Sequence, residues 1–285
     1  MNKKFLRLAL IGKDVSASHS GRMHAFILRH FGVEVTYQNV SVFPEDFERT
    51  FSELLNCVDG INITIPYKLT AIPLLDSIDD DAALCGAVNT VVTAKNPFWA
   101  GEQTGKNWGY NTDGKGFFLM LKNEGIDVFG KTVLVLGSGG AGRCVAKVLK
   151  ENDATVYLTR RKKERLPQVC KSLGVYAYDT ENEPMDVDIL INCTGVGMHE
   201  SVGQSPVGRE IIGRTKVAID LIYRPERSAF LEIADELGKR ILNGKGMLFY
   251  QAYYADCLFL GRKADEETAT KLYCKYCLEE LENKA

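Results

Sequence analysis

A lysine and an aspartate occupy positions at which an α/β fold can place catalytic groups. Lys68 follows the segment Asn62–Pro66, whose alternating polar and apolar side chains are typical of a strand that the proline ends. Ligands of open α/β sheets bind at the carboxyl ends of the strands, which is where this lysine would lie. Asp113 stands at the start of a helical pattern. Amines and carboxylates of this kind can transfer protons and can bind charged or polar groups of a small molecule.

Each of these polar residues also has a simpler interpretation. Lys68 taken alone would be a surface lysine, Asp113 can be a helix N-cap, and one serine of Ser16–Ser20 is expected to cap the first helix. Taken together, the clusters supply hydroxyls, amides, one amine and one carboxylate. Such a set suits a small, polyhydroxylated acid that is bound next to a hydride carrier.

A glycine-rich loop predicts the hydride carrier. The run Gly137–Gly142 directly follows the apolar strand pattern Thr132–Leu136 and opens a helix. The first glycine permits the turn, the second lets the backbone approach a pyrophosphate, and the third lets helix and strand pack closely. The helix N-terminus adds unpaired N–H groups and a partial positive charge, so a dinucleotide site is favoured over a bare turn. The expected contacts are Gly137, Ser138, Gly139, Gly140 and Ala141.

The next strand pattern indicates which dinucleotide is bound. An NAD site usually carries an acidic residue about 20 residues after the first glycine, where it bonds the ribose 2′-hydroxyl. Here the strand Thr155–Leu158 is followed by Thr159, Arg160 and Arg161, without an acid at its tip. Because arginine binds phosphate through two hydrogen bonds and a carboxylate would repel it, the sequence predicts NADP. Arg160 is the first choice for the 2′-phosphate, Arg161 stacks on adenine or shares that phosphate, and the alternative is a solvated charged loop.

The elements that must position these residues alternate between strand and helix almost throughout the chain. Strand patterns cover Phe5–Ile11, Val35–Val40, Gly60–Ile65, Val88–Thr93, Thr132–Leu136, Thr155–Leu158, Asp188–Asn192 and Val217–Asp220, with a short one near Ile241. Helical patterns cover Gly21–Phe31, Glu45–Leu55, Asp113–Asn123, Ala141–Lys150, Arg227–Leu237 and an amphipathic terminal segment Asp265–Asn283 with Leu272, Leu278 and Leu281 on its apolar face. This order predicts an α/β fold whose parallel sheets carry helices on both faces.

Length, charge and cysteine usage restrict the class of protein. The chain has 285 residues with 35 basic and 37 acidic side chains, and its net charge of -2 argues against binding polyanions over the whole surface. Eight cysteines are scattered, and the N-terminal apolar run is typical of a strand rather than a signal peptide. We therefore expect a cytoplasmic enzyme with reduced thiols and no membrane span. Cys274 and Cys277 lack a second pair nearby and the four histidines form no known metal motif, so no metal is expected.

The order of these motifs resembles the shikimate dehydrogenase family, with its quinate/shikimate relatives, over nearly the whole chain. The landmarks are Ser18-x-Ser20 with His24, Asn62-x-Thr64-x-Pro66-x-Lys68, Gly86-Ala-Val-Asn89-Thr90, Asn111-Thr112-Asp113-Gly114, Gly137-x-Gly139-Gly-Ala-Gly142, Asp220-Leu-Ile-Tyr223, and Gly246-Met-Leu with Gln251-Ala252. The resemblance implies the reversible, NADP-linked reduction of 3-dehydroshikimate to shikimate.

The resemblance also implies a role for each site residue. Lys68 and Asp113 would form the catalytic pair. The expected substrate contacts are Ser18 and Ser20 for the carboxylate, Thr64, Asn89 and Gln251 for ring hydroxyls, and Tyr223 beside the substrate. Gly244, Gly246 and Met247 would lie at the cofactor.

We expect two α/β domains with a cleft between them. The N-terminal substrate domain, with a parallel-rich sheet, takes residues 1–112 plus 245–285, and a Rossmann-like NADP-binding domain takes residues 113–244. The expected partner is the small-molecule substrate, without nucleic acid or membrane, in a monomer or a homodimer. One departure from the family pattern is Gly21, where proline is common, which predicts a looser turn.

Three alternatives stay open at this level. The enzyme could use quinate as well as shikimate, or NAD as well as NADP, because the motifs do not exclude the extra ring hydroxyl of quinate. A folate-linked methylene dehydrogenase has a similar two-domain architecture, but no pterin-stacking tyrosine motif stands at the expected spacing. A non-enzymatic, dinucleotide-binding regulator would keep the glycine loop and would need neither Lys68 nor Asp113.

Overall fold

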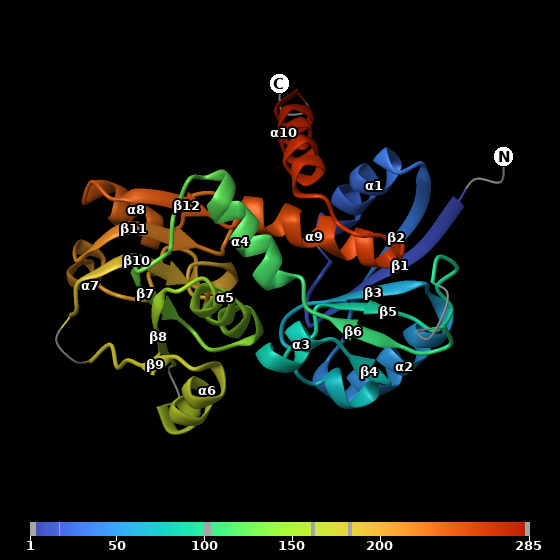
Figure 1. Cartoon of the computed structure of the whole chain (residues 1–285), viewed down its shortest axis with the longest axis horizontal. Helices are drawn as coiled ribbons and strands as arrows, with labels where there is room; N and C mark the ends of the chain where they lie inside the picture. Colours follow the sequence, from blue (N-terminus) through green and yellow to red (C-terminus); the bar gives the residue numbers. More distant parts are fainter. Residues whose placement is uncertain (1–3, 17, 100–103, 161–162, 182–183, 283–285) are drawn as a thin grey trace. The chain divides into compact units, whose positions relative to one another are not determined.

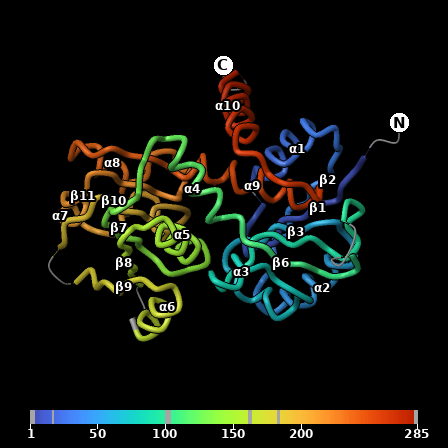
Figure 2. Tube along the Cα trace, viewed as in Figure 1, coloured from blue at the N-terminus to red at the C-terminus, as the bar shows by residue number. Residues whose placement is uncertain are grey.

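The computed structural model describes residues 4–16, 18–99, 104–160, 163–181 and 184–282. The chain divides into two compact units (Figures 1 and 2). Unit 1 contains the chain up to Gly116 and again from Phe249, and unit 2 contains Phe117–Leu248. Each change of unit falls inside a helix, first in α4 (Asp113–Asn123) and then in α9 (Lys245–Phe259). The boundaries predicted from the sequence, after residues 112 and 244, precede these two helices and stay a prediction.

Unit 1 is built on a six-stranded sheet with strand order β2-β1-β3-β5-β6-β4. Its strands are β1 (Lys4–Gly12), β2 (Val33–Ser41), β3 (Gly60–Ile63), β4 (Ser77–Ile78), β5 (Thr90–Val92) and β6 (Trp108–Tyr110). Strands β2, β1 and β3 are parallel to one another, but β5 runs antiparallel to both β3 and β6, so this sheet is mixed. Because Thr90 pairs with Asn62, β5 begins beside the carboxyl end of β3 and brings the residue before it, Asn89, to that edge.

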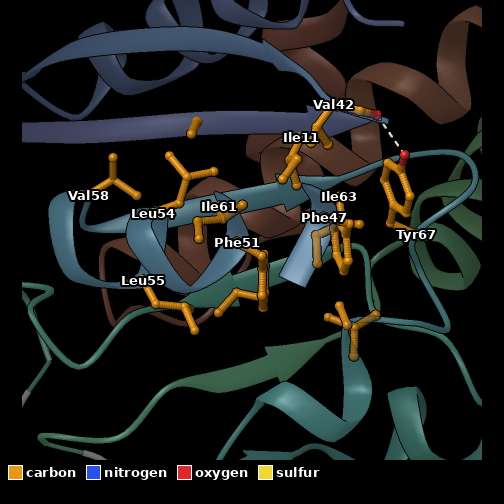
Figure 3. Packing of buried hydrophobic residues seen from close by; sticks show 14 of the residues in the cluster. Ile11, Val42, Phe47, Phe51, Leu54, Leu55, Val58, Ile61, Ile63 and Tyr67 are labelled. Atoms are coloured by element: carbon orange, nitrogen blue, oxygen red, sulfur yellow. Dashed lines mark hydrogen bonds between the residues drawn. The ribbon is translucent and has the colours of Figure 1, made fainter. Parts of the chain in front are cut away.

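The helices of unit 1 cover a core on each face of this sheet. They are α1 (Ser20–His30), α2 (Phe47–Cys57), α3 (Asp80–Cys85), α10 (Glu266–Glu282) and the larger part of α9, with short 3-10 turns at Pro44–Asp46 and Ile72–Leu74. One buried cluster joins Phe47 and Phe51 of α2 to Ile61 and Ile63 of β3 (Figure 3). Removing such aromatic side chains from a core typically costs about 3 to 5 kcal/mol, so this cluster is a main source of the unit's stability.

The opposite face of the sheet is covered by the helix that returns from unit 2. Leu6 and Leu8 of β1 cluster there with Ala255 and Phe259 of α9. A Cβ atom at Gly60 would overlap the Phe259 ring, so the glycine that opens β3 permits this close approach.

Helix α10 buries Ala269, Leu272 and Tyr276. Tyr276 contacts the rings of Phe26 and Phe249, with centroids 5.2 and 5.3 Å away. Leu278 and Leu281 are 61% and 65% exposed, so the predicted apolar face was wrong beyond Leu272. The buried positions follow the spacing i, i+3 and i+7 from Ala269, and Leu278 and Leu281 lie off that stripe.

Unit 2 has a fully parallel six-stranded sheet with strand order β12-β11-β10-β7-β8-β9. Its strands are β7 (Thr132–Leu136), β8 (Thr155–Thr159), β9 (Tyr176–Ala177), β10 (Val187–Asn192), β11 (Thr215–Asp220) and β12 (Arg240–Asn243). Its further helices are α5 (Gly140–Glu151), α6 (Leu166–Leu173), α7 (Arg209–Gly213) and α8 (Ala229–Glu236), with 3-10 turns at Lys163–Arg165 and His199–Ser201. The strand order reverses beside β7, which is the position at which such sheets bind ligands.

Most element boundaries match the sequence patterns within two or three residues, and β7 and α4 coincide with them. Helix α8 starts at Ala229 because the Ser228 side chain accepts from the Leu231 N–H as a cap. Strand β3 ends at Ile63, two residues early, because the Tyr67 N–H donates to the Thr64 carbonyl and closes a turn. Among the described helices, none is long and apolar enough to cross a membrane.

Candidate active site

A partly buried ion pair joins the lysine and the aspartate that the sequence singled out. Lys68 Nζ donates to Asp113 Oδ2 at 2.5 Å, and the two side chains are only 14% and 5% exposed. Electrostatic attraction is stronger here than on a solvated surface, because little water screens the two charges. Lys68 is therefore held in one place and is not a freely moving surface lysine.

Local hydrogen bonds explain why these two residues meet. Lys68 lies just after the turn that ends β3, and its carbonyl accepts from the Val88 N–H at 2.7 Å. Asp113 is the first residue of α4, and its N–H donates to Asn111 Oδ1 at 3.0 Å. Asn111 in turn donates to the Ala87 carbonyl at 2.7 Å. The segment before β5 thus anchors both the lysine turn and the start of α4, which brings the two charges together.

Asn89 connects this ion pair to further polar groups. Its Nδ2 donates to Asp113 Oδ1 at 2.8 Å, to Thr112 Oγ1 at 2.9 Å and to Gln251 Oε1 at 3.4 Å. Its Oδ1 accepts from the backbone N–H of Thr112 at 2.9 Å. Because a backbone N–H can only donate, this last bond sets the orientation of the Asn89 amide. Both oxygens of Asp113 therefore accept hydrogen bonds from side chains, Oδ2 from Lys68 and Oδ1 from Asn89.

The two serines form a second polar cluster at the start of α1. Ser18 Oγ donates to Ser20 Oγ at 3.0 Å and accepts from the Ser20 N–H at 3.3 Å. The N-cap residue of α1 is His19, whose side chain makes no cap hydrogen bond, so the predicted serine N-cap was wrong. The Ser18 hydroxyl, one position before the N-cap, instead accepts a hydrogen bond from the N–H of Ser20, the first residue of α1. Asn39 of β2 holds the segment by donating to the Ser18 carbonyl at 3.1 Å.

Thr64 stands after β3, where the turn to Lys68 begins. Its N–H donates to the Ile11 carbonyl at 3.0 Å, and its methyl group leaves no room for a Cβ atom at Gly12. The site residues predicted from the sequence that belong to unit 1 are Ser18, Ser20, Thr64, Lys68, Asn89, Asp113 and Gln251. Hydrogen bonds connect four of these, Lys68, Asn89, Asp113 and Gln251, into one network.

The glycine loop of unit 2 has the geometry of a phosphate cradle. Gly137 has φ +100, which L side chains rarely adopt, and a Cβ atom at Gly142 would overlap the Gly137 carbonyl oxygen. Gly139 is the N-cap of α5 and has nothing within 4 Å of the place where a Cβ would lie. The first and third glycines thus let strand and helix pack, and the second leaves open space before unpaired helix N–H groups. This arrangement fits a pyrophosphate.

The tip of β8 lies against the same loop. Gly137 N–H donates to the carbonyl of Thr159, the last residue of β8, at 3.1 Å, and Arg160 follows as a half-buried residue. Arg161 lies outside the described residues. A further arginine, Arg143 in the first turn of α5, donates to the Ser138 carbonyl at 3.2 Å. The sequence reasoning did not select Arg143, although its position directly after the glycine loop could have indicated it.

Four further residues predicted for the site also belong to unit 2. Tyr223 is 36% exposed, and burial raises the pKa of its phenol while Arg224 opposes the shift. Gly244 makes room for the Leu221 backbone, since a Cβ there would overlap the Leu221 carbonyl. Met247 is buried, with 7% exposure. The neighbouring Gly246 makes room for Met120, whose Cγ would lie 2.9 Å from a Cβ atom.

Comparison with known proteins gives one consistent family. The model of the shikimate dehydrogenase substrate binding domain matches residues 10–91. The chain is 34% identical over 269 residues to shikimate dehydrogenase (NADP(+)) of Clostridium perfringens strain SM101, covering 93% of this chain and 96% of that one. The structure is similar to shikimate dehydrogenase 1 from Peptoclostridium difficile, with a TM-score of 0.85, 31% identity and 97% and 98% of the two chains covered. It is also similar to the Thermus thermophilus shikimate 5-dehydrogenase in complex with NADP(H) and shikimate, with a TM-score of 0.81, 33% identity and 95% and 99% covered.

Proposed function

The chain belongs to the shikimate dehydrogenase family, and on this premise we propose how its own residues carry out the reaction. It is an NADP-dependent oxidoreductase that interconverts 3-dehydroshikimate and shikimate. The observation that carries the proposed roles is the partly buried Lys68–Asp113 pair, which Asn89 joins to Gln251. A dinucleotide-binding regulator would need no such pair.

The cofactor, when bound, supplies or accepts the hydride. The glycine loop supports binding of its pyrophosphate at Gly137, Ser138, Gly139, Gly140 and Ala141, because the loop pairs an open Gly139 with the N-terminus of α5. The tip of β8, with Thr159, Arg160 and Arg161, would receive the 2′-phosphate, and Gly244 and Met247 would lie toward the nicotinamide. The assignment of the glycine loop follows the family motif, whereas that of Arg160 and Arg161 rests on the positive charge that follows β8.

For the substrate, the two clusters of unit 1 offer complementary chemistry. Ser18 and Ser20 present adjacent hydroxyls, which can both donate to a carboxylate. Thr64, Asn89 and Gln251 present groups that can bond ring hydroxyls, and we place Tyr223 beside the substrate by the family motif. Shikimate carries one carboxylate and several ring hydroxyls, so its polar groups match this set.

Lys68 is the proposed proton donor. As hydride reaches the ketone carbon, negative charge develops on the ketone oxygen, and the ammonium group of Lys68 can stabilise that charge and then transfer a proton to it. Asp113 holds the lysine by the 2.5 Å bond, and Asn89 holds Asp113 by its second oxygen. In the oxidation of shikimate the roles reverse, and a neutral Lys68 accepts the hydroxyl proton.

The assay that tests this function compares kcat/KM for shikimate and quinate, each with NADP and with NAD. We expect shikimate with NADP to give the highest value of the four combinations. A higher value with quinate would assign the chain to the quinate-using relatives instead. NADPH binding without turnover of either acid would contradict an enzymatic role.

Arg160 gives a prediction about the choice of cofactor. The Arg160→Glu variant is expected to raise the KM for NADP about 10- to 100-fold while leaving the KM for NAD almost unchanged, because a carboxylate repels the 2′-phosphate that arginine binds. The matched control is Arg209→Glu, which makes the same charge change in unit 2 at an arginine that forms an exposed pair with Glu236. Equal losses with NADP and NAD would remove Arg160 from the 2′-phosphate site.

Two further features remain predictions from the sequence. These are a cytoplasmic location and a monomeric or homodimeric state. Sedimentation of the purified protein would decide the second.

A further inference from the structure

A histidine and an aspartate form a buried pair that the proposed mechanism does not use. His24 of α1 and Asp256 of α9 approach to 2.6 Å between Nδ1 and Oδ1, and their side chains are 1% and 0% exposed. Within the described part of the chain, the second oxygen of Asp256 is buried without a hydrogen-bond partner. Burial raises the pKa of this carboxyl to about 6, and His24 opposes that shift. A buried carboxylate of this kind is costly, so its presence calls for a function.

The pair holds a tyrosine of the neighbouring strand. The His24 ring stacks on Tyr37 of β2, with centroids 4.9 Å apart and planes inclined by 17°. The Tyr37 hydroxyl donates to Asn62 Oδ1 at 3.0 Å. Burial and the Asp256 charge raise the pKa of Tyr37 well above its usual value, and the Ser20 side chain opposes this shift. Tyr37 therefore remains a neutral phenol, and its hydroxyl faces Ser20 and Asn62.

The departure at Gly21 has a physical explanation in this arrangement. A Cβ atom at Gly21 would lie 3.2 Å from Cδ1 of Tyr37, so a larger residue would press on the tyrosine ring. The ring therefore packs against the first turn of α1, which begins with Ser20. Two positions along the same strand, Asn39 holds the Ser18 carbonyl at 3.1 Å. Tyr37 and Asn39 lie on the same face of β2, because alternate residues of a strand share one face. The turn at Gly21, which the sequence predicted to be looser, is therefore supported by both of these side chains.

We propose that Tyr37, His24 and Asp256 are positioning residues for the serine pair, and that they hold Ser18 and Ser20 in the geometry that receives the substrate carboxylate. Asp256 fixes the imidazole through its hydrogen bond with Nδ1, and the imidazole fixes the tyrosine ring by stacking. Tyr37 then supports the turn that carries the serines in two ways, through its ring at Gly21 and through its hydroxyl, which bonds Asn62 and faces Ser20. The proposal rests on the proposed function, since the serine pair is the carboxylate site only in a shikimate dehydrogenase. Changes at these three residues should therefore weaken substrate binding and leave the proton transfer at Lys68 unaffected.

The test compares steady-state kinetics of the whole protein and four variants with shikimate and NADP. We expect Asp256→Leu and Tyr37→Phe each to raise the KM for shikimate about tenfold, with kcat and the KM for NADP nearly unchanged, because misplaced serines weaken binding without touching the reacting pair. Asp256→Asn keeps an acceptor for the imidazole and should recover most of the wild-type KM. Tyr253→Phe is the control. Like Tyr37→Phe it removes one tyrosine hydroxyl, and like Asp256→Leu it changes α9, but this hydroxyl donates to the Asp265 carbonyl at 3.0 Å.

The outcomes separate this proposal from the proposed function. Wild-type turnover together with an unchanged KM in both Asp256→Leu and Tyr37→Phe would overturn the positioning role alone. A Tyr253→Phe variant that raises the KM as much as Asp256→Leu would show a general effect on α9 and would also overturn it. If Asp256→Leu does not fold, Tyr37→Phe decides, since it keeps the stacked ring and removes only the hydroxyl. A wild-type protein that neither binds nor oxidises shikimate would overturn the proposed function, and the positioning role with it.

Discussion

Replacing Lys68 by alanine is expected to lower kcat for shikimate oxidation about a thousandfold, with only a modest change in the KM for shikimate. The variant loses the proton acceptor of the oxidation and the charge that stabilises the developing oxyanion. It leaves the serine pair in place to bind the carboxylate, and Asn89 and Gln251 in place to bind the ring hydroxyls. The measurement is steady-state kinetics in both directions, because the reverse reduction uses the same group and should lose a similar factor.

The chain offers a matched control for this substitution. Lys115 forms an ion pair with Asp81 at 2.7 Å, but the two side chains are 54% and 41% exposed, so Lys115→Ala makes the same charge change at a solvated pair. We expect kcat to be unaffected there. Asp113→Asn should lower kcat as well, and the double variant should lose little more than Lys68→Ala, because both residues act as one unit. A Lys68→Ala enzyme with wild-type kcat would exclude the lysine as the catalytic group.

Gly142→Ala is expected to abolish useful NADP binding and to destabilise unit 2. The new Cβ atom would overlap the Gly137 carbonyl oxygen, which belongs to the backbone and cannot swing away as a side chain would. Either the loop or the first turn of α5 must move, at a cost of about 1 to 3 kcal/mol for the overpacking. If binding NADPH has to overcome a distortion of that size, its affinity falls roughly 10- to 100-fold, so the dissociation constant for NADPH should rise by at least about tenfold.

Alanine variants of two other glycines distinguish a loss of stability from a loss of NADPH binding. Gly139→Ala adds a Cβ atom with nothing within 4 Å, at an N-cap with φ -73, so its thermal stability should remain close to wild type. It narrows the space for a pyrophosphate, so NADPH binding, followed by fluorescence titration, should weaken. Gly213→Ala, also with nothing within 4 Å, should change neither property. Wild-type stability and NADPH affinity in Gly142→Ala would show that the loop does not need its third glycine.

The sequence predicted the strands and helices that carry long, regular patterns. The apolar, β-branched run at β7 and the helical pattern of α4 need no distant partner to be recognised. The strands β4, β6 and β9 have only two or three residues each, and the sequence did not indicate them. The antiparallel direction of β5 was also missed. Strands this short are defined by their partners in the sheet, so local pattern carries too little information.

The candidate site was predicted unevenly for a related reason. Lys68 and Asp113 stand in motifs with clear positions relative to a strand and a helix, and the structure pairs them. Thr112, which bonds Asn89, lies inside one of these motifs but was not selected. The partners His24 and Asp256 are 232 positions apart, and nothing in the neighbourhood of either residue indicates the other. A buried polar pair of this kind follows from tertiary packing alone.

The discontinuous course of unit 1 affects the order in which the protein can fold during synthesis. Leu6 and Leu8 leave the ribosome long before their partners Ala255 and Phe259. Unit 2, by contrast, is complete once Leu248 has emerged. Because domains fold as units during translation, the inserted unit can finish first, while one apolar face of the first sheet must wait for α9. The nascent chain therefore exposes that face longest, and chaperone binding or aggregation during synthesis should concentrate there.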